Sequence, residues 1–302
     1  FTWKYANEHG YAVGVFNHNH ELVGHYAGFR RQVSYFGVKK QVLQIGDVMV
    51  HPSERAIFTR KGVFFLAASY FFEHYIGDNK PFLLAFGFPN QRAMSIGKRL
   101  NLYAQVEKIS ICQWFCKTNF IGKIFQLSPV TSIEKNIVDS LWKNMEASLK
   151  NYICTWRDNE YINYRYINRP EGDYRLFIIK NYFTRKIISI VVLKCFQSEM
   201  KIQWLDYIGP LKYIKKTISA IQYYGKINGF NYFESWVTEC MKPNFLTKDS
   251  NVHKTDIEIA QSNWKDSRNL HQKTNQNHNR NNDQRHYGQL ACNQKHHPHK
   301  QQ

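Results

Sequence analysis

One stretch of the chain, Gly46 to Gly77, carries residue types that could hold a phosphorylated ligand. It reads GDVMVHPSERAIFTRKGVFFLAASYFFEHYIG, which predicts a buried strand, a basic loop with a glycine, and a long apolar helix. In the loop, Arg60 and Lys61 supply positive charge, and Gly62 allows close approach of the backbone. The N–H groups at the start of the next helix favour an anion. The pattern therefore suits a pyrophosphate, and the alternative is a solvated basic turn before a core helix.

Three side chains near the end of the predicted strand could accept a proton, namely Asp47, His51 and Glu54. Apolar residues follow Asp47 in the strand, which predicts partial burial and a raised pKa. The alternative, which we favour, is that Asp47 caps or makes a hydrogen bond within the sheet. His51 has an ordinary pKa of about 6.5, but a histidine before a proline in a turn is as often a packing residue.

The composition is that of a folded and strongly basic chain. Its 302 residues carry a formal net charge of +18, and 43% of them are hydrophobic and 16% aromatic. This length and apolar content predict two domains with sizeable cores. The charge favours polyanions, acidic surfaces or phosphorylated small molecules as partners, and by itself it does not choose among them.

The cysteines and histidines indicate neither a disulfide framework nor a metal site. The six cysteines lack CxxC pairs and Cys/His ligand spacing, so we expect reduced thiols. His18, His20 and His25 have no Cys or carboxylate at ligand spacing, and we expect no metal there. No apolar run reaches the ~20 residues of a membrane helix. We therefore expect no membrane span and a cytoplasmic location, and because the chain begins at Phe1, an N-terminal truncation.

The first region alternates strands and helices, which predicts a mixed α/β sheet. Three strands come first, joined by a polar hairpin turn at Asn17 to Glu21. The later elements that we predict are the helix Gly62 to Ile76, the buried strand Phe82 to Phe88, the helix Gln91 to Leu100 and the strand Tyr103 to Ile111.

The second region repeats this order in outline. We place the domain boundary within Lys117 to Val130, a weakly patterned segment with a proline. After the predicted helix Ser132 to Tyr152 come two alternating strands, a helix from Leu211 to Asn228 and a last strand from Tyr232 to Thr238. This gives two domains, residues 1–118 and 131–250. From 251 to 302 the chain becomes rich in Asn, Gln and His, and we expect a disordered tail.

A motif in the second region has two interpretations. It comprises Arg157, Asp158, Tyr161, Tyr164, Arg165 and Tyr166. Such residues could form a basic aromatic surface for nucleic acid, where rings stack on bases and arginines meet phosphates. A helix that docks its aromatic rings on a sheet, with Arg165 paired to Asp158, is the alternative that we favour.

Several motifs resemble those of the GCN5-related N-acetyltransferase (GNAT) superfamily: DVMVHPSER, TRKGVFFLA and LAFGFPNQRAMSIGKRLNLY. The resemblance covers Trp3 to about Ile111 and lacks the family's opening strand and helices, as a truncated chain would. The chain looks like a bacterial two-domain subgroup that carries GFPN and a second half with RD-x-x-Y-x-x-(W/Y)RY. The resemblance implies a GNAT-like acyl-CoA N-acyltransferase fold of the α/β class, in two tandem GNAT-like halves.

The same resemblance implies roles for particular residues. The backbone of Val48, Met49 and Val50 would contact the pantetheine arm of acetyl-CoA. The pyrophosphate would lie against Arg60, Lys61, Gly62 and Val63, and Asn90 would sit near the sulfur.

The chain departs from the family at the position where many members carry a tyrosine that protonates the leaving thiolate. That position is Gly97 here. We expect Tyr103 to substitute for the missing acid, although it could equally be a core strand aromatic.

Two functions follow as hypotheses. The first is an acyl-CoA-dependent N-acyltransferase that acts on a small amine such as an amino sugar, by direct attack of the amine on the thioester. Asp47 or His51 would be its base and Tyr103 its acid. The second is a non-catalytic basic protein on the same scaffold that binds nucleic acid.

Overall fold

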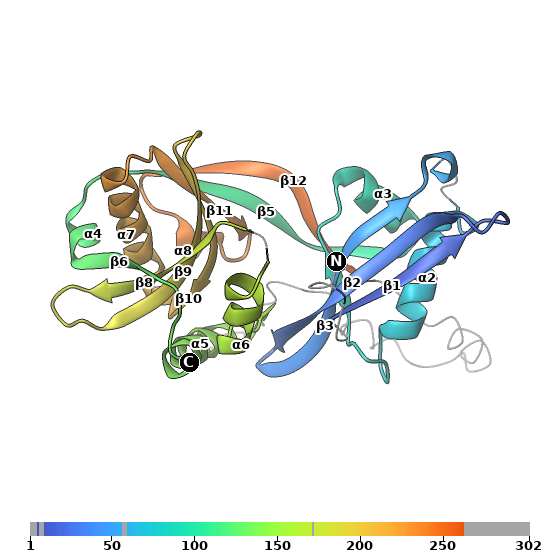
Figure 1. Cartoon of the computed structure of the whole chain (residues 1–302), viewed down its shortest axis with the longest axis horizontal. Coiled ribbons are helices and arrows are strands. Elements are labelled where there is room, and N and C mark those ends of the chain that lie inside the picture. Colours follow the sequence, from blue (N-terminus) through green and yellow to red (C-terminus); the bar gives the residue numbers. More distant parts are fainter. Residues whose placement is uncertain (1–4, 6–8, 56–58, 171, 263–302) are drawn as a thin grey trace, which may run out of the picture. The chain divides into compact units, whose positions relative to one another are not determined.

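The computed structural model describes residues 5, 9–55, 59–170 and 172–262, which form two compact units (Figure 1). The first unit holds the described residues up to Glu107 and again Asp256 to Ser262, and the second holds Lys108 to Thr255. The division therefore falls earlier than the predicted boundary within Lys117 to Val130. That segment is structured and belongs to the second unit.

The first unit is a mixed sheet in the order β1-β2-β3-β4-β12-β5. Strands β1, β2 and β3 form the predicted antiparallel meander, and the short β4 is parallel to β3. The bounds are β1 Gly10–Phe16, β2 Leu22–Tyr35, β3 Val38–Val50, β4 Ala85–Gly87, β5 Tyr103–Phe115 and β12 Ser250–Ser262. Strands β5 and β12 each belong partly to both units, because the division falls after Glu107 and after Thr255. Strand β4 is shorter than the predicted Phe82 to Phe88, because Phe82 makes only an isolated bridge to Ile76.

Helix α2, Val63–Tyr75, packs against the meander and supplies the core of the first unit. Its apolar face recurs at helical spacing, as the sequence indicates. Phe71 and Phe72 are fully buried, and both rings contact the ring of Tyr26 on β2. Two further elements complete the unit: the 3₁₀ turn η1, Pro52–Glu54, and the helix α3, Gln91–Arg99.

The second unit repeats the order of the first. Three antiparallel strands, β8, β9 and β10, are followed by helix α7 and by β11, which is parallel to β10. Each unit therefore has a meander, a helix, and then a strand parallel to the third strand. That this unit is a second, diverged GNAT-like domain stays a prediction.

The third strand is also irregular at a corresponding place in both units. The β2–β3 register shifts between His25 and Ala27, and the β9–β10 register shifts between Trp204 and Asp206. Both shifts are β-bulges, which bend a strand and redirect its side chains.

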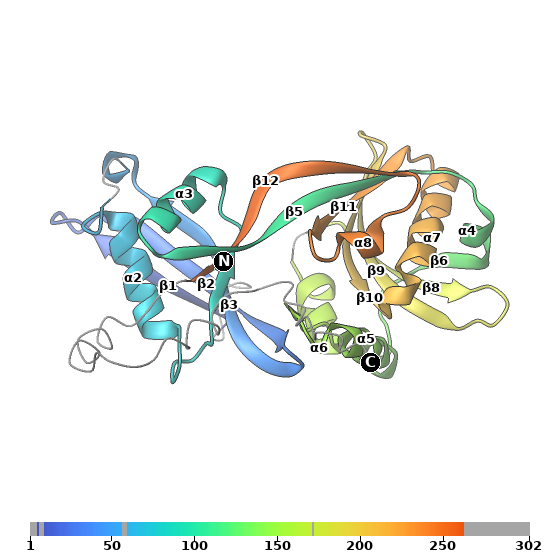
Figure 2. The same cartoon turned by 180° about the vertical axis from the view of Figure 1, so that it is seen from behind.

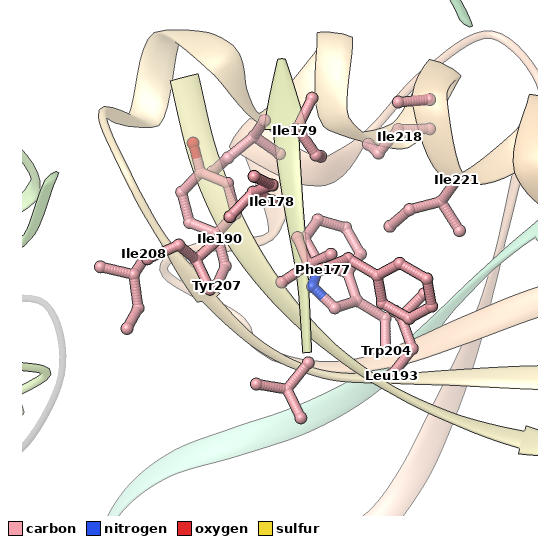
Figure 3. Close-up of a cluster of buried hydrophobic side chains, with 14 of the residues drawn as sticks. Phe177, Ile178, Ile179, Ile190, Leu193, Trp204, Tyr207, Ile208, Ile218 and Ile221 are labelled. Atoms are coloured by element: carbon pink, nitrogen blue, oxygen red, sulfur yellow. The ribbon is translucent and has the colours of Figure 1, made fainter. Parts of the chain in front are cut away.

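The bounds of the second unit's elements are α4 Phe120–Ile124, β6 Phe125–Val130, α5 Lys135–Leu149, β7 Ile153–Thr155, α6 Asn159–Ile162, the π-helical turn η2 Asn163–Ile167, β8 Tyr174–Asn181, β9 Ile187–Phe196, β10 Lys201–Ile208, the 3₁₀ turn η3 Leu211–Tyr213, α7 Ile214–Ile227, β11 Tyr232–Thr238 and α8 Lys242–Phe245. Aliphatic side chains of β8 and β9 lie beneath α7, around Phe177 and Trp204 (Figure 3). The middle of each strand is buried, Leu176 to Ile179 in β8 and Ile188 to Leu193 in β9. The burial of β9 is therefore continuous and not alternating as predicted.

The prediction that a disordered tail begins at residue 251 is wrong. Residues 250–262 form β12, which pairs with β4 through Ala260 and Gln261. The polar residues near 251 concealed an alternating segment, in which Ile257 and Ile259 bracket Glu258. The remainder of the expected tail, 263–302, lies outside the described residues.

A charge placed in β12 tests this correction. Ala260 is 4% exposed, so Ala260→Asp buries an unpaired carboxylate, and we expect it to lower the free energy of unfolding by about 3 kcal/mol or more. Val252→Asp on the same strand is the control, because Val252 is 39% exposed and its replacement should change stability by about 0.5 kcal/mol or less. Urea unfolding measures both variants, and equal stabilities would contradict the placement of β12.

Candidate functional site

The candidate site lies where β3 and β4 part. The two strands pair at Leu43 with Ala85 and at Gln44 with Phe86, and within the described residues their register ends there. Beyond that point β3 continues to Val50, whereas β4 ends at Gly87. The parting of two parallel strands leaves room for a ligand between them.

A β-bulge turns the backbone of β3 at this point. Met49 pairs with His25 and Gly46 pairs with Ala27, so two residues of β3 face the single residue Tyr26. Asp47, within the bulge, has a φ of 54°, a left-handed conformation that aspartate tolerates better than most residues. The bulge is held by His25, whose Nδ1 lies 2.6 Å from the Asp47 carbonyl oxygen.

A cavity of about 260 Å³ occupies the space between the strands. Its floor and walls are mostly apolar, and three polar side chains that carry chemistry border it: Asp47, Asn90 and Tyr103. The lining residues are Ile45, Gly46, Asp47, Val48, Phe64, Phe72, Ala85, Phe86, Gly87, Phe88, Pro89, Asn90, Ala93, Tyr103, Ala260, Gln261 and Ser262. An apolar cleft with a few convergent polar groups is the usual form of a small-molecule site.

The cavity brings together four of the residues predicted from the sequence: Asp47, Val48, Asn90 and Tyr103. Met49 and Val50 follow on β3 but do not line it, and Met49 is largely exposed. The Val50 carbonyl accepts a hydrogen bond from Nε of Arg55 at 2.8 Å.

Asp47 is exposed, so the expectation of partial burial is wrong. The bulge carries its side chain away from the sheet interior. One carboxylate oxygen accepts a hydrogen bond from the Tyr5 hydroxyl at 2.6 Å. Burial, and then this bond, raises the pKa of Tyr5 above its usual value.

His51 lies outside the cavity and begins the turn η1. Its Nδ1 accepts a hydrogen bond from the Ser53 backbone N–H at 3.4 Å and lies 2.8 Å from the Ser53 hydroxyl. His51 is therefore an exposed cap of η1 and not a packed residue, and its role as a base stays a prediction.

The basic loop leads into α2 but does not line the cavity. Gly62 is the N-cap of α2. The next residue, Val63, packs tightly on Gly24 of β2, and a Cβ added to Gly24 would overlap the Val63 side chain. Arg60 and Lys61 are exposed, and the Arg60 guanidinium lies 6.0 Å from the centre of the Phe65 ring. One residue into the helix, Phe64 reaches the cavity wall, so the start of α2 borders the site.

Asn90 closes the other side of the cavity as the N-cap of α3. Its side-chain oxygen accepts a hydrogen bond from the Ala93 N–H at 2.9 Å. This cap explains why the helix begins at Gln91, shortly after β4 ends at Gly87.

Tyr103 occupies the place that a side chain at Gly97 would need. A Cβ built on Gly97 would overlap the Tyr103 ring, so the glycine and the tyrosine fit each other. The Tyr103 hydroxyl lies 3.0 Å from the hydroxyl of the fully buried Tyr26. Burial raises the pKa of Tyr103 to about 12, against the smaller opposite effect of the hydrogen bond with Tyr26.

Two parts of the site were missed by the sequence analysis. Tyr26 is 77 residues away from its partner Tyr103, and no local pattern announces such a pair. Ala260, Gln261 and Ser262 of β12 line the cavity, and the Ser262 hydroxyl accepts a hydrogen bond from the Ala85 N–H at 3.1 Å. Their signal was the alternation around Ile257 and Ile259.

The second unit's aromatic motif docks on its sheet, which is the favoured interpretation. Asp206 on β10 accepts hydrogen bonds from Nε of Arg157 at 2.7 Å and from the hydroxyls of Tyr161 and Tyr166 at 2.7 and 2.8 Å. Burial alone would raise the pKa of Asp206, but Arg157 and these hydrogen bonds outweigh it and hold the pKa below its usual value. These groups are therefore committed to a buried network.

In the part of the chain that the structure describes, no cluster of three or more His, Cys, Asp or Glu residues is arranged to hold a metal. Over the same residues, the helices are all too short or too polar to span a bilayer.

Solved structures with the same arrangement identify the fold. A protein from Enterococcus faecalis V583, described as a probable N-acyltransferase of unknown function, matches 84% of this chain with a TM-score of 0.61 and 12% identity. A GCN5-related N-acetyltransferase from Anabaena variabilis matches 83% with a TM-score of 0.58 and 8% identity. The chain has a GNAT-like fold. It spans 62% of the length of each of these two structures.

The chain is also similar in fold to a protein that was solved with a bound acyl-CoA. The N-myristoyltransferase of Saccharomyces cerevisiae, solved with myristoyl-CoA and inhibitors, matches 83% of this chain and 67% of its own length, with a TM-score of 0.54 and 11% identity. No protein-family model matches the sequence, and neither does any curated protein. At these identities the likeness concerns the fold.

The fit between Gly97 and Tyr103 in this GNAT-like unit can be tested by Gly97→Ala. Alanine is favoured over glycine in a helix by about 1 kcal/mol, but here its Cβ overlaps the Tyr103 ring, and overpacking costs about 1–3 kcal/mol. We expect a net loss of about 1 kcal/mol in urea unfolding. Ser95→Ala, on the exposed side of the same helix, is the control and should not destabilise the chain. A Gly97→Ala protein more stable than the wild type would show that the ring lies elsewhere.

Proposed function

We propose that the first unit binds an acyl-CoA, with acetyl-CoA as the expected donor, and transfers the acyl group to a small amine such as an amino sugar. The observation that carries the proposal is the cavity at the parting of β3 and β4, which both Asp47 and Tyr103 line. The descriptions of the similar structures, an N-acyltransferase and a protein with bound myristoyl-CoA, support an acyl-CoA as the donor.

The residues around the cavity fit the parts of such a donor. The apolar lining suits the thin pantetheine arm, and the end of the β3–β4 register leaves the backbone near Val48 beside the cavity. The pyrophosphate would lie at the start of α2, where Arg60 and Lys61 add charge to the helix N-terminus. Asn90, at the cavity edge, would stand near the sulfur.

Direct transfer requires a base for the amine and a donor for the leaving sulfur. Asp47 is exposed at the cavity and can take a proton from the incoming ammonium. As the C–N bond forms and the C–S bond breaks, Tyr103 can donate a hydrogen bond to the thiolate. Because the pKa of Tyr103 is about 12, its phenol stays protonated at neutral pH and acts as a hydrogen-bond donor.

Binding of the donor can be measured by titration calorimetry of the whole chain with acetyl-CoA. Arg60→Ala combined with Lys61→Ala should weaken binding by a few kcal/mol, since a hydrogen bond to a charged group is worth about 1.5–3 kcal/mol. The matched control is Lys39→Ala with Lys40→Ala, which removes two charges at the other end of β3. An unchanged dissociation constant in the first variant would refute the pyrophosphate placement, and absence of wild-type binding at millimolar acetyl-CoA would refute the function.

Tyr103→Phe separates binding from chemistry. The phenylalanine keeps the ring against Gly97 and removes only the hydroxyl, so affinity for acetyl-CoA should be unchanged. We expect kcat for CoA release with an amino sugar as acceptor to fall by about 10²-fold, the lower end of what general acids contribute. Tyr70→Phe is the control, because Tyr70 is an exposed tyrosine of α2 outside the cavity. A variant with wild-type kcat would remove Tyr103 from the mechanism.

A further inference from the structure

Two neighbouring elements of the second unit hold large apolar side chains in solvent. They are α4 and the turn between β8 and β9, and the side chains are Phe120, Ile121, Tyr182 and Phe183. Their exposed fractions are 75%, 45%, 52% and 75%. We call these four residues the apolar tip. Figures 1 and 2 show α4 beside the end of the β8–β9 hairpin from opposite sides.

Helix α4 is fixed with its apolar residues outward. A Cβ on Gly122 would overlap Tyr223 and the Ser219 carbonyl of α7, so the helix backbone lies directly on α7 at this glycine. Asn119 caps α4 through the Gly122 N–H at 2.6 Å and also donates to the Ser219 carbonyl at 3.1 Å. With this face held on α7, Phe120 remains in solvent.

The β8–β9 turn is equally well formed. The Asn181 side-chain oxygen accepts hydrogen bonds from the N–H groups of Phe183 and Thr184, each at 3.0 Å. The Tyr182 N–H donates to the Ile124 carbonyl at 2.7 Å, which ties the turn to the end of α4. Hydrogen bonds therefore fix both α4 and the β8–β9 turn in the conformation that exposes the apolar tip.

The surroundings of the tip are strongly basic. The elements around the tip, α4, β6, β8, β9 and α7, lie within segments 108–133, 174–198 and 207–233, which together contain twelve Lys or Arg and no Asp or Glu. One of the twelve, Lys117, pairs with Asp249 from outside these segments. Lys123 on α4 and Arg185 and Lys186 in the turn are exposed at the tip itself. A partner for this surface must offer both negative charge and an apolar phase.

An anionic bilayer offers both. Phenylalanine, isoleucine and tyrosine insert into the boundary between headgroups and acyl chains, while lysine and arginine beside them meet anionic headgroups. A single-stranded nucleic acid would satisfy the charge and could stack on the rings, but Ile121 has no π face for a base. We propose that the apolar tip and its basic surroundings attach this protein peripherally to an anionic lipid surface.

The test is cosedimentation of the full chain with two kinds of vesicle. One is phosphatidylcholine alone, and the other contains about one third phosphatidylglycerol, which makes its surface anionic. We expect binding to the anionic vesicles that weakens as salt is raised, and little binding to the neutral ones. Failure to bind anionic vesicles, or equal binding to both kinds, would overturn the proposal.

Two variants divide the apolar from the charged contribution. Phe120→Ser with Phe183→Ser, and separately Lys123→Glu with Arg185→Glu and Lys186→Glu, should each weaken vesicle binding at least about tenfold. Phe16→Ser is the control, because Phe16 is an exposed phenylalanine of the first unit next to Asn17 and His18, and its replacement should leave binding unchanged. All replaced side chains are exposed, and thermal unfolding verifies that each variant folds.

Two outcomes of the variants would count against the lipid surface. Wild-type vesicle binding by the double serine variant would show that the tip does not insert. Tight binding of a single-stranded oligonucleotide, without binding to vesicles, would assign the basic surface to nucleic acid. Neither outcome bears on acetyl-CoA binding by the first unit, because calorimetry measures that separately.

Discussion

The candidate site depends on one constraint in the first sheet: β3 and β4 pair for two residues and then part. Parallel neighbours usually continue their ladder, and the end of this one leaves space between the strands. The bulge at Asp47 bends β3 at that point, while Asn90 begins α3 directly after β4. The cavity, its apolar lining and the polar groups at its edge all follow from this parting of the strands.

Within that space, packing determines which hydroxyl is available. Gly97 has no side chain, and the ring of Tyr103 fills the space that a Cβ at Gly97 would occupy. The tyrosine that lines the cavity therefore comes from a strand, and its hydroxyl lies 3.0 Å from that of the buried Tyr26. Burial keeps the phenol protonated far above neutral pH, so the site offers a hydrogen-bond donor there and not a second anion. Among the described residues that line the cavity, Asp47 alone carries a carboxylate.

The second unit has the same order of elements, but the aspartate at its bulge is buried in a hydrogen-bond network. Its third strand also carries a bulge, but Asp206 at that bulge lies in a buried network with Arg157 and two tyrosines. Removing one member of such a pair leaves an uncompensated charge, so the network ties η2 and its neighbours to β10. Basic charge collects instead around α4 and α7, where the apolar tip protrudes.

The sequence by itself determined the elements and their order, because apolar periodicity and turn residues are local signals. It placed the meander, α2, α3 and α7 within a few residues and singled out Asp47. The resemblance to the GNAT superfamily added Val48, Asn90 and Tyr103, and all four residues line the cavity. Only the tertiary structure decided the contacts between distant segments. The pair Tyr26 and Tyr103, the return of β12 to β4, and the exposure of Asp47 depend on register, bulge and packing. These are properties of neighbours in space, which no window along the chain contains.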